Sequence, residues 1–384
     1  MKTPKANNLK KTFSSLPLKW YYDEKQFQKE LNKIWSHNWV YVCHESSLID
    51  NLSYKTITIS KQSILILKDK EGSFLAYLNT CKHRGSIILD NLQGKLKSNV
   101  LVCPYHQWSY NASDGSLLKT SSKPNDDFDK SKYGLKKIQL KIWNGLIFIN
   151  LSSKKSFSVK KVFQYFDKTI SKLDISKFEL GFTWTKEVKC NWKIYWENYS
   201  ECLHCPNIHP ELSKLVPLYQ RRLVDVKDVE NWKILKKNTD PKFQGGLRKG
   251  ADTWSSDGSS QGHYIKNLQE EIHTKGQIYI SSWPSMFLGV YGDHIRVVRI
   301  LPLLNDKIQL TAEWLFQNET LRDPKYDIKN VTDFGILVMK QDADACELNQ
   351  KGVYNYNNEK GVLMPEEYII KDFQDWLRKS IKLN

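Results

Sequence analysis

The stretch N-W-K-I-Y-W-E-N-Y-S-E-C-L-H-C-P-N-I-H-P, residues 191–210, brings two histidines, two glutamates and two cysteines together within twenty residues. Up to Pro206 its pattern predicts a helix, on which side chains three or four residues apart lie on the same face. Glu197, Glu201 and His204 should therefore project from one stripe, and Pro206 should end the regular turn. The short segment beyond it would carry His209 back towards His204, beside the carboxylate.

Two imidazoles beside an acid are two-thirds of the 2-His-1-carboxylate site that binds non-haem Fe(II) and leaves coordination positions open for O2. The missing ligand would be a carboxylate from a distant part of the chain. Cys202 and Cys205 offer a rival site, in which two thiolates and the two imidazoles bind zinc. Four ligands within eight residues, however, leave no loop to wrap a tetrahedron. A purely structural role of both histidines stays open at this point.

Further upstream, two short segments each carry a cysteine and a histidine: C-K-H-R-G with Cys81 and His83, and C-P-Y-H-Q-W with Cys103 and His106. Such pairs on the loops of β-hairpins are typical of a [2Fe–2S] cluster in which both cysteines bind one iron and both histidines the other, the Rieske arrangement. Gly85 is expected to relieve backbone crowding near this cluster. A zinc ribbon needs C-x2-C or H-x3-5-H spacings, and neither pair has them.

Composition and charge narrow the class of protein. The chain has 384 residues, of which 40% are hydrophobic and 12% aromatic, which is ample for two or three domains with buried cores. The net charge of +16 is spread over single and paired lysines without a basic helix or a known binding motif. We therefore expect no nucleic-acid partner and assign the charge to solubility and to docking of an acidic redox partner.

The sequence also gives expectations about the cellular compartment and about membrane-spanning segments. The first residues lack the apolar core and cleavage site of a signal peptide, and no apolar run approaches eighteen residues. A cytoplasmic protein without a membrane segment is expected. In a reducing compartment its seven cysteines should be thiols or metal ligands, not disulfides.

The pattern of apolar residues predicts an α+β protein. Asp23 is a plausible N-cap for a helix that ends at Ile34, and strands are expected over 55–59, 64–68, 74–78 and, after a hairpin turn, 142–151. The larger part is expected to hold helices over 156–175, 336–350 and 368–381, strands over 178–188, 277–280, 295–301 and 308–316, and a mobile lid over 240–262. We expect three parts: an N-terminal helical segment packed on the catalytic domain, a β domain and a catalytic domain, over residues 1–38, 39–152 and 153–384.

With its two metal motifs in this order, the chain resembles the α (oxygenase) subunit of Rieske non-haem iron oxygenases from Trp20 to about Gly352. The segment around His204 is most similar to the branch with glycine betaine, choline and carnitine monooxygenases. The resemblance implies a small antiparallel Rieske domain and a larger catalytic domain whose antiparallel sheet is flanked by helices, a helix-grip or START-like fold. It also implies a head-to-tail homotrimer. Gln107 stands where the family usually has glycine, and Leu203 where it usually has tyrosine.

The resemblance also implies roles for individual carboxylates. It places the third iron ligand at Asp342, with Asp344 as the alternative, beside His204 and His209. Glu201 would bridge His204 of its own chain and His106 of the neighbouring subunit, carrying the electron between the two metal centres. Glu197, one turn earlier, would either influence the metal site without binding the metal or simply lie on the helix surface.

The expected activity follows from the resemblance. A flavin- or ferredoxin-type reductase would feed electrons through the cluster to the iron, O2 would be activated there, and a C–H bond beside nitrogen would be hydroxylated, with loss of formaldehyde. Aromatic faces would hold a trimethylammonium group through cation–π attraction, with Trp254, Trp283, Phe287 and Tyr291 as candidates. The α subunit of an aromatic-ring dioxygenase, a pure electron-transfer protein and a zinc-dependent nucleic-acid-binding protein are the alternatives.

Overall fold

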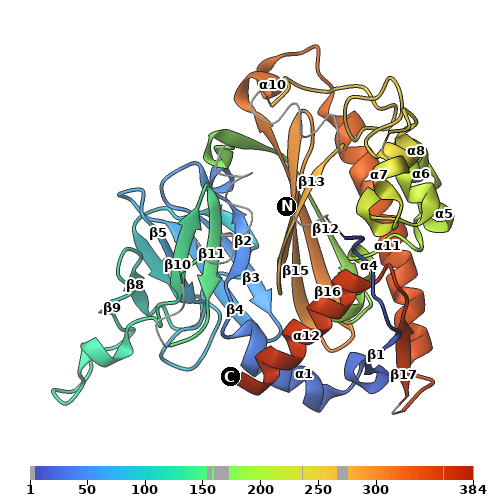
Figure 1. Cartoon of the computed structure of the whole chain (residues 1–384). Helices are drawn as coiled ribbons and strands as arrows, with labels where there is room; N and C mark the ends of the chain where they lie inside the picture. The colour runs from blue at the N-terminus through green and yellow to red at the C-terminus, as the bar shows by residue number, and fades with distance from the viewer. Residues whose placement is uncertain are drawn as a thin grey trace. The chain divides into compact units, whose positions relative to one another are not determined.

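The computed structural model describes residues 5–153, 158–159, 173–235, 237–265, 276–357 and 359–383 (Figure 1). The chain forms two compact units, a larger one of Met1–Ile34 with Phe163–Asn384 and a smaller one of Trp35–Val162. The domain limits expected after residues 38 and 152 remain predictions. Most of the helix expected over 156–175 lies outside the described residues.

The smaller unit is built from three antiparallel sheets. One sheet has the order β5-β4-β3-β6, and its first three members are the three short strands expected from the sequence. Asp69 shapes the turn between β4 and β5, because its carboxylate accepts hydrogen bonds from the backbone N–H groups of Glu71 and Ser73. The strands of this unit are β2 Val40–His44, β3 Ser53–Ile59, β4 Gln62–Lys68, β5 Phe74–Leu78, β6 Gln93–Lys95, β7 Val100–Val102, β8 Ser109–Asn111, β9 Leu117–Lys119, β10 Gln139–Trp143 and β11 Leu146–Asn150.

The other two sheets of this unit have the orders β7-β8-β9 and β10-β11-β2. Tyr77 lies in the core between the sheets, and its hydroxyl donates a hydrogen bond to the carbonyl of Ala112, which fixes the turn after β8. Short 3-10 helices cover Glu45–Leu48 and Lys130–Tyr133. The unit therefore presents its two Cys/His segments on loops, one after β5 and one between β7 and β8.

The larger unit is centred on a five-stranded antiparallel sheet of order β12-β16-β15-β14-β13. Its strands are β12 Phe178–Val188, β13 Ile278–Ser282, β14 Met286–Val290, β15 His294–Leu304 and β16 Lys307–Gln317. Four of them coincide with strands expected from the sequence. Strand β14 was not expected, because all five of its residues are buried and it therefore lacks the alternation that marks a half-exposed strand.

Helices α4 Trp192–Tyr199, α11 Ile328–Val353 and α12 Tyr368–Leu383 pack around this sheet (Figure 1). Helix α11 is longer than expected, because Asp327 caps its first turn by accepting from the N–H of Lys329. Near the N-terminus, Asp23 caps α1 Glu24–Glu30 as expected, and a π-helical turn, Leu31–Trp35, follows it. Strands β1 Phe13–Pro17 and β17 Lys360–Leu363 pair beside these helices.

Short helices fill the connection from α4 to β13. They are α5 Cys205–Ile208, α6 Pro210–Leu215, α7 Trp232–Leu235 and α8 Pro241–Gln244, with 3-10 turns at Pro217–Arg221 and Val226–Asp228. Two other 3-10 turns, Leu18–Tyr21 and Ile175–Lys177, precede α4, and α10 Asn318–Arg322 follows β16. Within the segment expected to be a lid, Thr253 is buried and its hydroxyl donates to the carboxylate of Asp293. The mobility of that segment stays a prediction.

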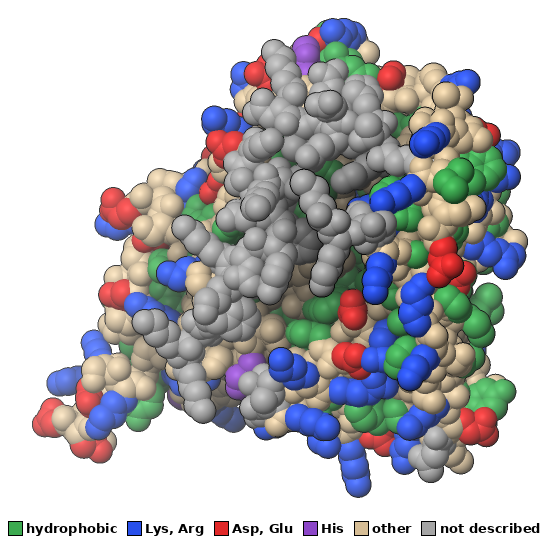
Figure 2. All heavy atoms as spheres, viewed as in Figure 1, with side chains coloured by type: hydrophobic (Ala, Val, Ile, Leu, Met, Phe, Trp, Pro, Cys, Tyr) green, Lys and Arg blue, Asp and Glu red, His purple; other side chains and the backbone are tan. Residues whose placement is uncertain are grey.

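The distribution of charged side chains on the surface agrees with the expectation from the sequence. On the face shown in Figure 2, Lys and Arg side chains are interspersed with acidic, uncharged and hydrophobic ones, without one basic stripe. Within the described ranges, no helix has the length and apolar character needed to cross a membrane.

A buried ion pair ties the N-terminal segment to α4. The Nζ of Lys193 lies 2.8 Å from Oε2 and 2.9 Å from Oε1 of Glu30, and both side chains are fully buried. Trp192 Nε1 and Gln26 Nε2 donate to the same carboxylate, at 2.8 and 2.9 Å. The charge of Glu30 is therefore compensated on several sides.

Replacing Lys193→Met should destabilise the protein by about 3–5 kcal/mol, because it leaves the Glu30 carboxylate buried without a countercharge. Adding Glu30→Gln should recover part of this loss, since an amide keeps hydrogen bonds without charge. Thermal unfolding of the three proteins measures both effects. The exposed ion pair of Lys19 with Asp23 is the control, and Lys19→Met should cost no more than about 1 kcal/mol. Equal losses at Lys19 and Lys193 would contradict the prediction.

Candidate metal centre

The helix expected up to Pro206 is shorter than predicted. Helix α4 ends at Tyr199, and Ser200 caps it with a hydrogen bond from its N–H to the carbonyl of Glu197. Pro206 does not end a turn but lies in the first turn of α5, where its missing N–H costs no helical hydrogen bond. Glu201 therefore lies in an irregular connection, so the idea of one stripe on a helix was wrong.

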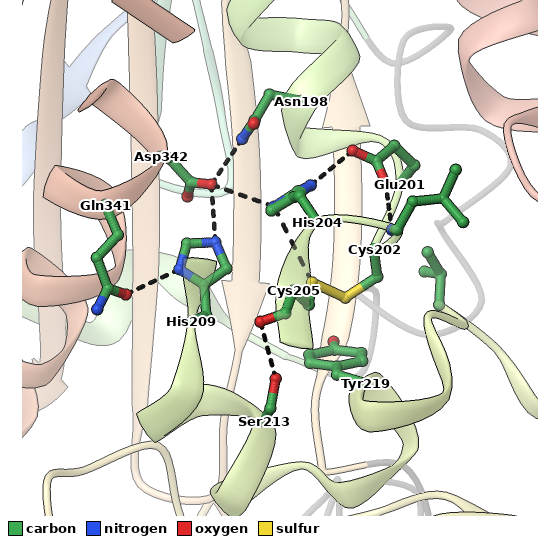
Figure 3. The surroundings of a disulfide bond; sticks show 12 residues. Asn198, Glu201, Cys202, His204, Cys205, His209, Ser213, Tyr219, Gln341 and Asp342 are labelled. Atoms are coloured by element: carbon green, nitrogen blue, oxygen red, sulfur yellow. Dashed lines mark hydrogen bonds and ion pairs between the residues drawn. A yellow bond between two sulfur atoms is a disulfide. The ribbon is translucent and has the colours of Figure 1, made fainter. Parts of the chain in front are cut away.

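The irregular connection still brings the two imidazoles together, as expected. The ring centroids of His204 and His209 are 5.1 Å apart, and both rings face Asp342 of α11 (Figure 3). One nitrogen of each histidine and a carboxylate oxygen of Asp342 all lie within 4.8 Å of one another. Asp344, the alternative ligand, is exposed on α11. The donor set is that of the 2-His-1-carboxylate class.

Each of the three ligands has a further hydrogen-bond partner that orients it (Figure 3). The Nδ1 of His204 lies 2.6 Å from Oε1 of Glu201, and the Nδ1 of His209 lies 2.8 Å from Oε1 of Gln341. Asn198 donates to Oδ1 of Asp342 at 2.6 Å. Both imidazoles thus turn Nε2 towards Asp342, at 3.5 and 2.9 Å, and hold Nδ1 against an oxygen acceptor. This is the arrangement by which outer partners fix the tautomer of metal-binding histidines.

The charges of the three groups are coupled. Burial alone would raise the pKa of Asp342, but hydrogen bonds from His204 and His209 and their charges lower it well below its usual range. Burial lowers the pKa of His204, but the hydrogen bonds to Asp342 and Glu201 outweigh this and raise it to about 9. His204 thus holds a proton that a divalent cation would have to displace.

A cavity of about 130 Å³ adjoins the two histidines and Asp342. Its wall contains several aromatic rings and an arginine beside polar and aliphatic side chains; the lining includes Tyr195, Tyr199, Tyr219, Trp254, Tyr279, Phe287 and Arg296. Tyr199 and Phe287 stack on each other with ring centroids 3.7 Å apart. A small ligand in this cavity would lie between the metal ligands and a set of aromatic rings.

The four aromatic residues proposed from the sequence divide into two pairs. Trp254 and Phe287 line the cavity. Trp283 does not, and its ring packs against Phe373 and Trp376. Tyr291 is buried behind Trp254, with ring centroids 5.1 Å apart, and is not part of the lining. The structure therefore contradicts Trp283 and Tyr291 as wall residues.

Sequence reasoning missed several residues of this site. Asn198 and Gln341, which hold Asp342 and His209, each stand close in the sequence to a proposed site residue, so this proximity was an available signal. Arg296 carried no specific local signal, since β15 also contains His294 and Arg299. Its place in the cavity depends on how β15 is positioned in the sheet.

The second predicted set of metal ligands lies in the smaller unit. The Nδ1 atoms of His83 and His106 are 3.2 Å apart, and the thiols of Cys81 and Cys103 lie within hydrogen-bonding reach of each other. Both cysteines are buried and His83 is exposed. The two thiols thus lie inside the unit and the imidazoles towards its surface, a donor set that fits a Rieske cluster.

The backbone conformation of the second loop explains why the family usually has glycine where this chain has Gln107. Gln107 adopts φ +57°, in the left-handed region that glycine enters without strain, which accounts for the glycine usual at this position. Gly85 also has a positive φ of +80°. No described protein atom lies within 4 Å of a Cβ built there, so backbone conformation, and not crowding by the protein, favours this glycine.

Cys202 and Cys205 form a disulfide, which contradicts the expectation of thiols (Figure 3). That expectation rested on the compartment, whereas the turn between α4 and α5 places the two Cα atoms 4.9 Å apart, within the range of a disulfide. The bond excludes the rival zinc site, because two sulfurs bonded to each other are not thiolate ligands. The remaining five cysteines are free and buried.

Glu197 does not lie on a face shared with His204. Its carboxylate accepts hydrogen bonds from the hydroxyl of Tyr21, at 2.8 and 2.9 Å, and from Nε2 of Gln374, at 2.9 Å. Burial raises its pKa to about 7, although these two donors and Lys193 lower it. Glu197 thus joins the N-terminal segment, α4 and α12.

Comparison with known proteins gives two family matches. A model described as the ring hydroxylating alpha subunit (catalytic domain) matches residues 176–382, and one described as the Rieske [2Fe-2S] domain matches residues 38–138. The glycine betaine monooxygenase oxygenase subunit of Pseudomonas aeruginosa is 27% identical over 404 residues, covering 96% of this chain and 90% of that protein. The chloroplastic choline monooxygenase of Amaranthus tricolor is 25% identical over 380 residues, covering 95% and 77%.

Solved structures agree in fold. The quaternary ammonium Rieske monooxygenase CntA, in complex with an inhibitor, matches with a TM-score of 0.74 at 21% identity, over 96% of this chain and 95% of that one. Naphthalene 1,2-dioxygenase from Rhodococcus sp. matches with a TM-score of 0.71 at 16% identity and the same coverage. The expected α+β fold, a Rieske domain with a larger catalytic domain, is thereby confirmed.

The raised pKa of Glu197 predicts how stability depends on pH. Between the ordinary pKa of a glutamate, about 4.3, and about 7, the folded protein holds a proton that the unfolded chain has lost. Stability contributed by this group is therefore lost as pH rises through that window. In Glu197→Gln, which cannot ionise, unfolding in urea at pH 5 and pH 8 should show a smaller loss of stability on raising the pH than in the wild type. An equal or larger loss in the variant would show that Glu197 is not the group responsible.

Proposed function

Because this chain belongs to the family of ring-hydroxylating oxygenase alpha subunits that carry a Rieske [2Fe-2S] domain, we propose that it oxidises a small quaternary ammonium compound resembling glycine betaine. As a member of the family it is a Rieske non-haem iron oxygenase, whose cofactors are the [2Fe–2S] cluster and a mononuclear iron. The choice of substrate rests on one observation, the small aromatic cavity beside the two histidines. Relatives named for glycine betaine and choline support it.

In this proposal, His204, His209 and Asp342 hold the mononuclear iron. Two imidazoles and a carboxylate within 4.8 Å of one another, each with an outer partner, suit Fe(II) and leave positions free. Two buried cysteines and two outward histidines, at positions 81, 103, 83 and 106, hold the cluster. The iron supplies O2 activation, and the cluster supplies the electrons that this activation consumes.

The aromatic wall would select and orient the substrate. A quaternary ammonium group cannot donate a hydrogen bond, so ring faces are the protein groups that attract it best, by roughly 0.5–2 kcal/mol per ring. The rings of Tyr199 and Phe287 border the cavity, as do Asp342 and His204. An ammonium held against these rings keeps an N-methyl group at the metal end. The cavity volume of about 130 Å³ is well below that of pockets for drug-sized ligands, about 300–1,000 Å³, which favours a small substrate.

The proposed reaction balances as a monooxygenation. One methyl C–H becomes C–OH, the second oxygen atom of O2 leaves as water, and two electrons and two protons are consumed. The carbinolamine then loses formaldehyde: the C–N bond breaks, its electron pair stays on nitrogen, and the hydroxyl proton is released as the C=O bond forms. The product is an amine with one methyl group fewer.

Electrons would reach the iron from a neighbouring copy of the chain. Glu201 and His204 border the aromatic cavity and also a second cavity, of about 380 Å³, so they form a shared wall. In a head-to-tail homotrimer, His106 of the neighbour would reach Glu201 from that second cavity and use its hydrogen bond to His204 as the path. A separate flavin- or ferredoxin-type reductase would reduce the cluster.

An aromatic-ring dioxygenase is the alternative. The fold similarity to naphthalene 1,2-dioxygenase permits it, and co-purification of a small β subunit would favour it. The small volume of the cavity speaks against a polycyclic ring.

The ligand assignment predicts metal contents. Anaerobically prepared wild type should contain about three irons and two sulfides per chain. His209→Ala or Asp342→Ala should lower this to about two irons with two sulfides, and leave the visible absorption of the cluster unchanged, because only the mononuclear site loses a donor. Asp344→Ala, on the exposed side of α11, is the matched control and should keep about three irons. Loss of sulfide in Asp342→Ala, or zinc in place of iron, would contradict the assignment.

The function is tested by supplying the protein with NADH, a Rieske-type reductase, O2 and glycine betaine. Substrate-dependent NADH oxidation should be accompanied by formaldehyde and dimethylglycine in equal amounts. Choline, carnitine and indole, assayed in parallel, separate the quaternary amine class from the aromatic alternative. If quaternary amines release only peroxide, without formaldehyde, the proposed substrate class is wrong.

A further inference from the structure

The side chain of Arg296 is an unusual member of the cavity wall. It extends from β15, is only 5% exposed and lines the cavity beside the two histidines. Its Nε has no hydrogen-bond partner, and the described part of the structure gives its guanidinium no ion pair with a carboxylate. Buried arginines are normally paired with an acid, because burial strips a cation of its water.

The surroundings hold this cation in place without neutralising it. The guanidinium carbon lies 5.9 Å from the ring centroid of Trp254 and 5.6 Å from that of Tyr291, so both rings give partial compensation by cation–π attraction. Gly335 of α11 makes room for it, since a Cβ at that position would lie 3.0 Å from Nη1. The fold thus reserves space for a positive charge in the wall of the cavity.

Two further donors of the same wall lack partners. Among the described residues, neither Nε1 of Trp254 nor the hydroxyl of Tyr199 has a hydrogen-bond acceptor, and both residues line the cavity. An indole N–H can only donate, and Trp254 is 3% exposed, so water outside the protein does not serve it. Together with Arg296, the wall offers several unused donors and a positive charge, the requirements for binding a carboxylate.

The rest of the cavity has a different character. Asp342 and Glu201 border it at the metal end, where their two negative charges would offset those of a divalent iron. Burial and the nearby Tyr291 raise the pKa of Tyr199, Arg296 lowers it and Asp342 raises it. A quaternary ammonium would be repelled by Arg296 and attracted to the aromatic rings and to the carboxylates of Asp342 and Glu201. A zwitterion in this cavity would therefore turn its carboxylate towards Arg296.

We propose that Arg296, with Nε1 of Trp254, binds a carboxylate of the substrate, so that the substrate is a zwitterion with an N-methylated ammonium at one end and a carboxylate at the other. This inference rests on the proposed function and narrows it to betaines, at the expense of quaternary amino alcohols. The carboxylate anchors the molecule at β15, and its N-methyl groups then point towards His204, His209 and Asp342. The small cavity volume of about 130 Å³ favours a short spacer between the two charges.

The experiment compares two proteins and two substrates. Wild type and Arg296→Met are each assayed with glycine betaine and with its isosteric amide, which keeps the quaternary ammonium and lacks the carboxylate charge. In Arg296→Met, kcat/KM for the betaine should fall about 100-fold, as expected when a buried charge pair loses one partner, while the value for the amide should not fall, because the amide offers Arg296 no negative charge to bind. Arg296→Lys, which keeps the charge, should recover part of the loss on the betaine.

The ratio of the two substrates is insensitive to how much of a variant is folded, which protects the test from a loss of stability. Arg299→Met serves as the matched control, because Arg299 lies on the opposite face of β15, where it donates to Thr311 at 3.2 Å. Its ratio of betaine to amide should equal that of wild type. An equal loss on betaine and amide in Arg296→Met would overturn the inference.

Calorimetric titration of the intact protein with glycine betaine, its amide and choline separates this inference from the proposed function. If the wild type oxidises none of these amines but binds betaine more tightly than choline, and Arg296→Met abolishes that preference, the carboxylate site stands and the proposed reaction fails. If the wild type demethylates betaine and choline equally well and Arg296→Met changes neither, the reaction stands and the carboxylate site fails.

Discussion

The hydrogen bonds between Asp342 and the two imidazoles of His204 and His209 are the constraint on which the larger unit depends. They join the middle of α11 to the irregular connection after α4, two segments more than 130 residues apart. Buried carboxylates are costly unless they are paired, so α11 must lie where both rings reach Asp342. Asn198 binds Asp342 and Gln341 binds His209, so these two side chains must also lie close to the site. A site built in this way is rigid before any metal binds, which suits a 2-His-1-carboxylate iron centre.

Charges of both signs line the same cavity. The carboxylates of Asp342 and Glu201 and the guanidinium of Arg296 from β15 all border it. Aromatic rings are part of the same wall, and such rings attract a cation without offering it a hydrogen bond. Charge and shape together therefore favour a small zwitterion over an uncharged ring.

The smaller unit positions its metal-binding side chains in a different way. Its two loops bury the sulfur donors and leave the imidazoles nearer the surface, and two left-handed residues, Gly85 and Gln107, give each loop its turn. A glutamine in that conformation costs more than a glycine would, by about 1 kcal/mol. Its side chain is exposed, so it is free of packing demands, and the loop keeps its conformation.

The sequence by itself determined the chemistry of the protein. Donor residues at short spacing, such as Cys81 with His83 or His204 with His209, are visible in the sequence because they are local, and so are the strands with alternating burial. The tertiary structure decided whatever depends on distant segments or on a local break: where α4 ends, that Cys202 and Cys205 come close enough to bond, and that Glu197 faces the N-terminal segment. It also decided which aromatic residues line the cavity and that Arg296 reaches it without an ion pair to any acid in the described part of the chain. The periodicity of apolar residues in the sequence cannot show these features. A fully buried segment is apolar on every face, and the packing of the whole sheet determines which residues it contacts.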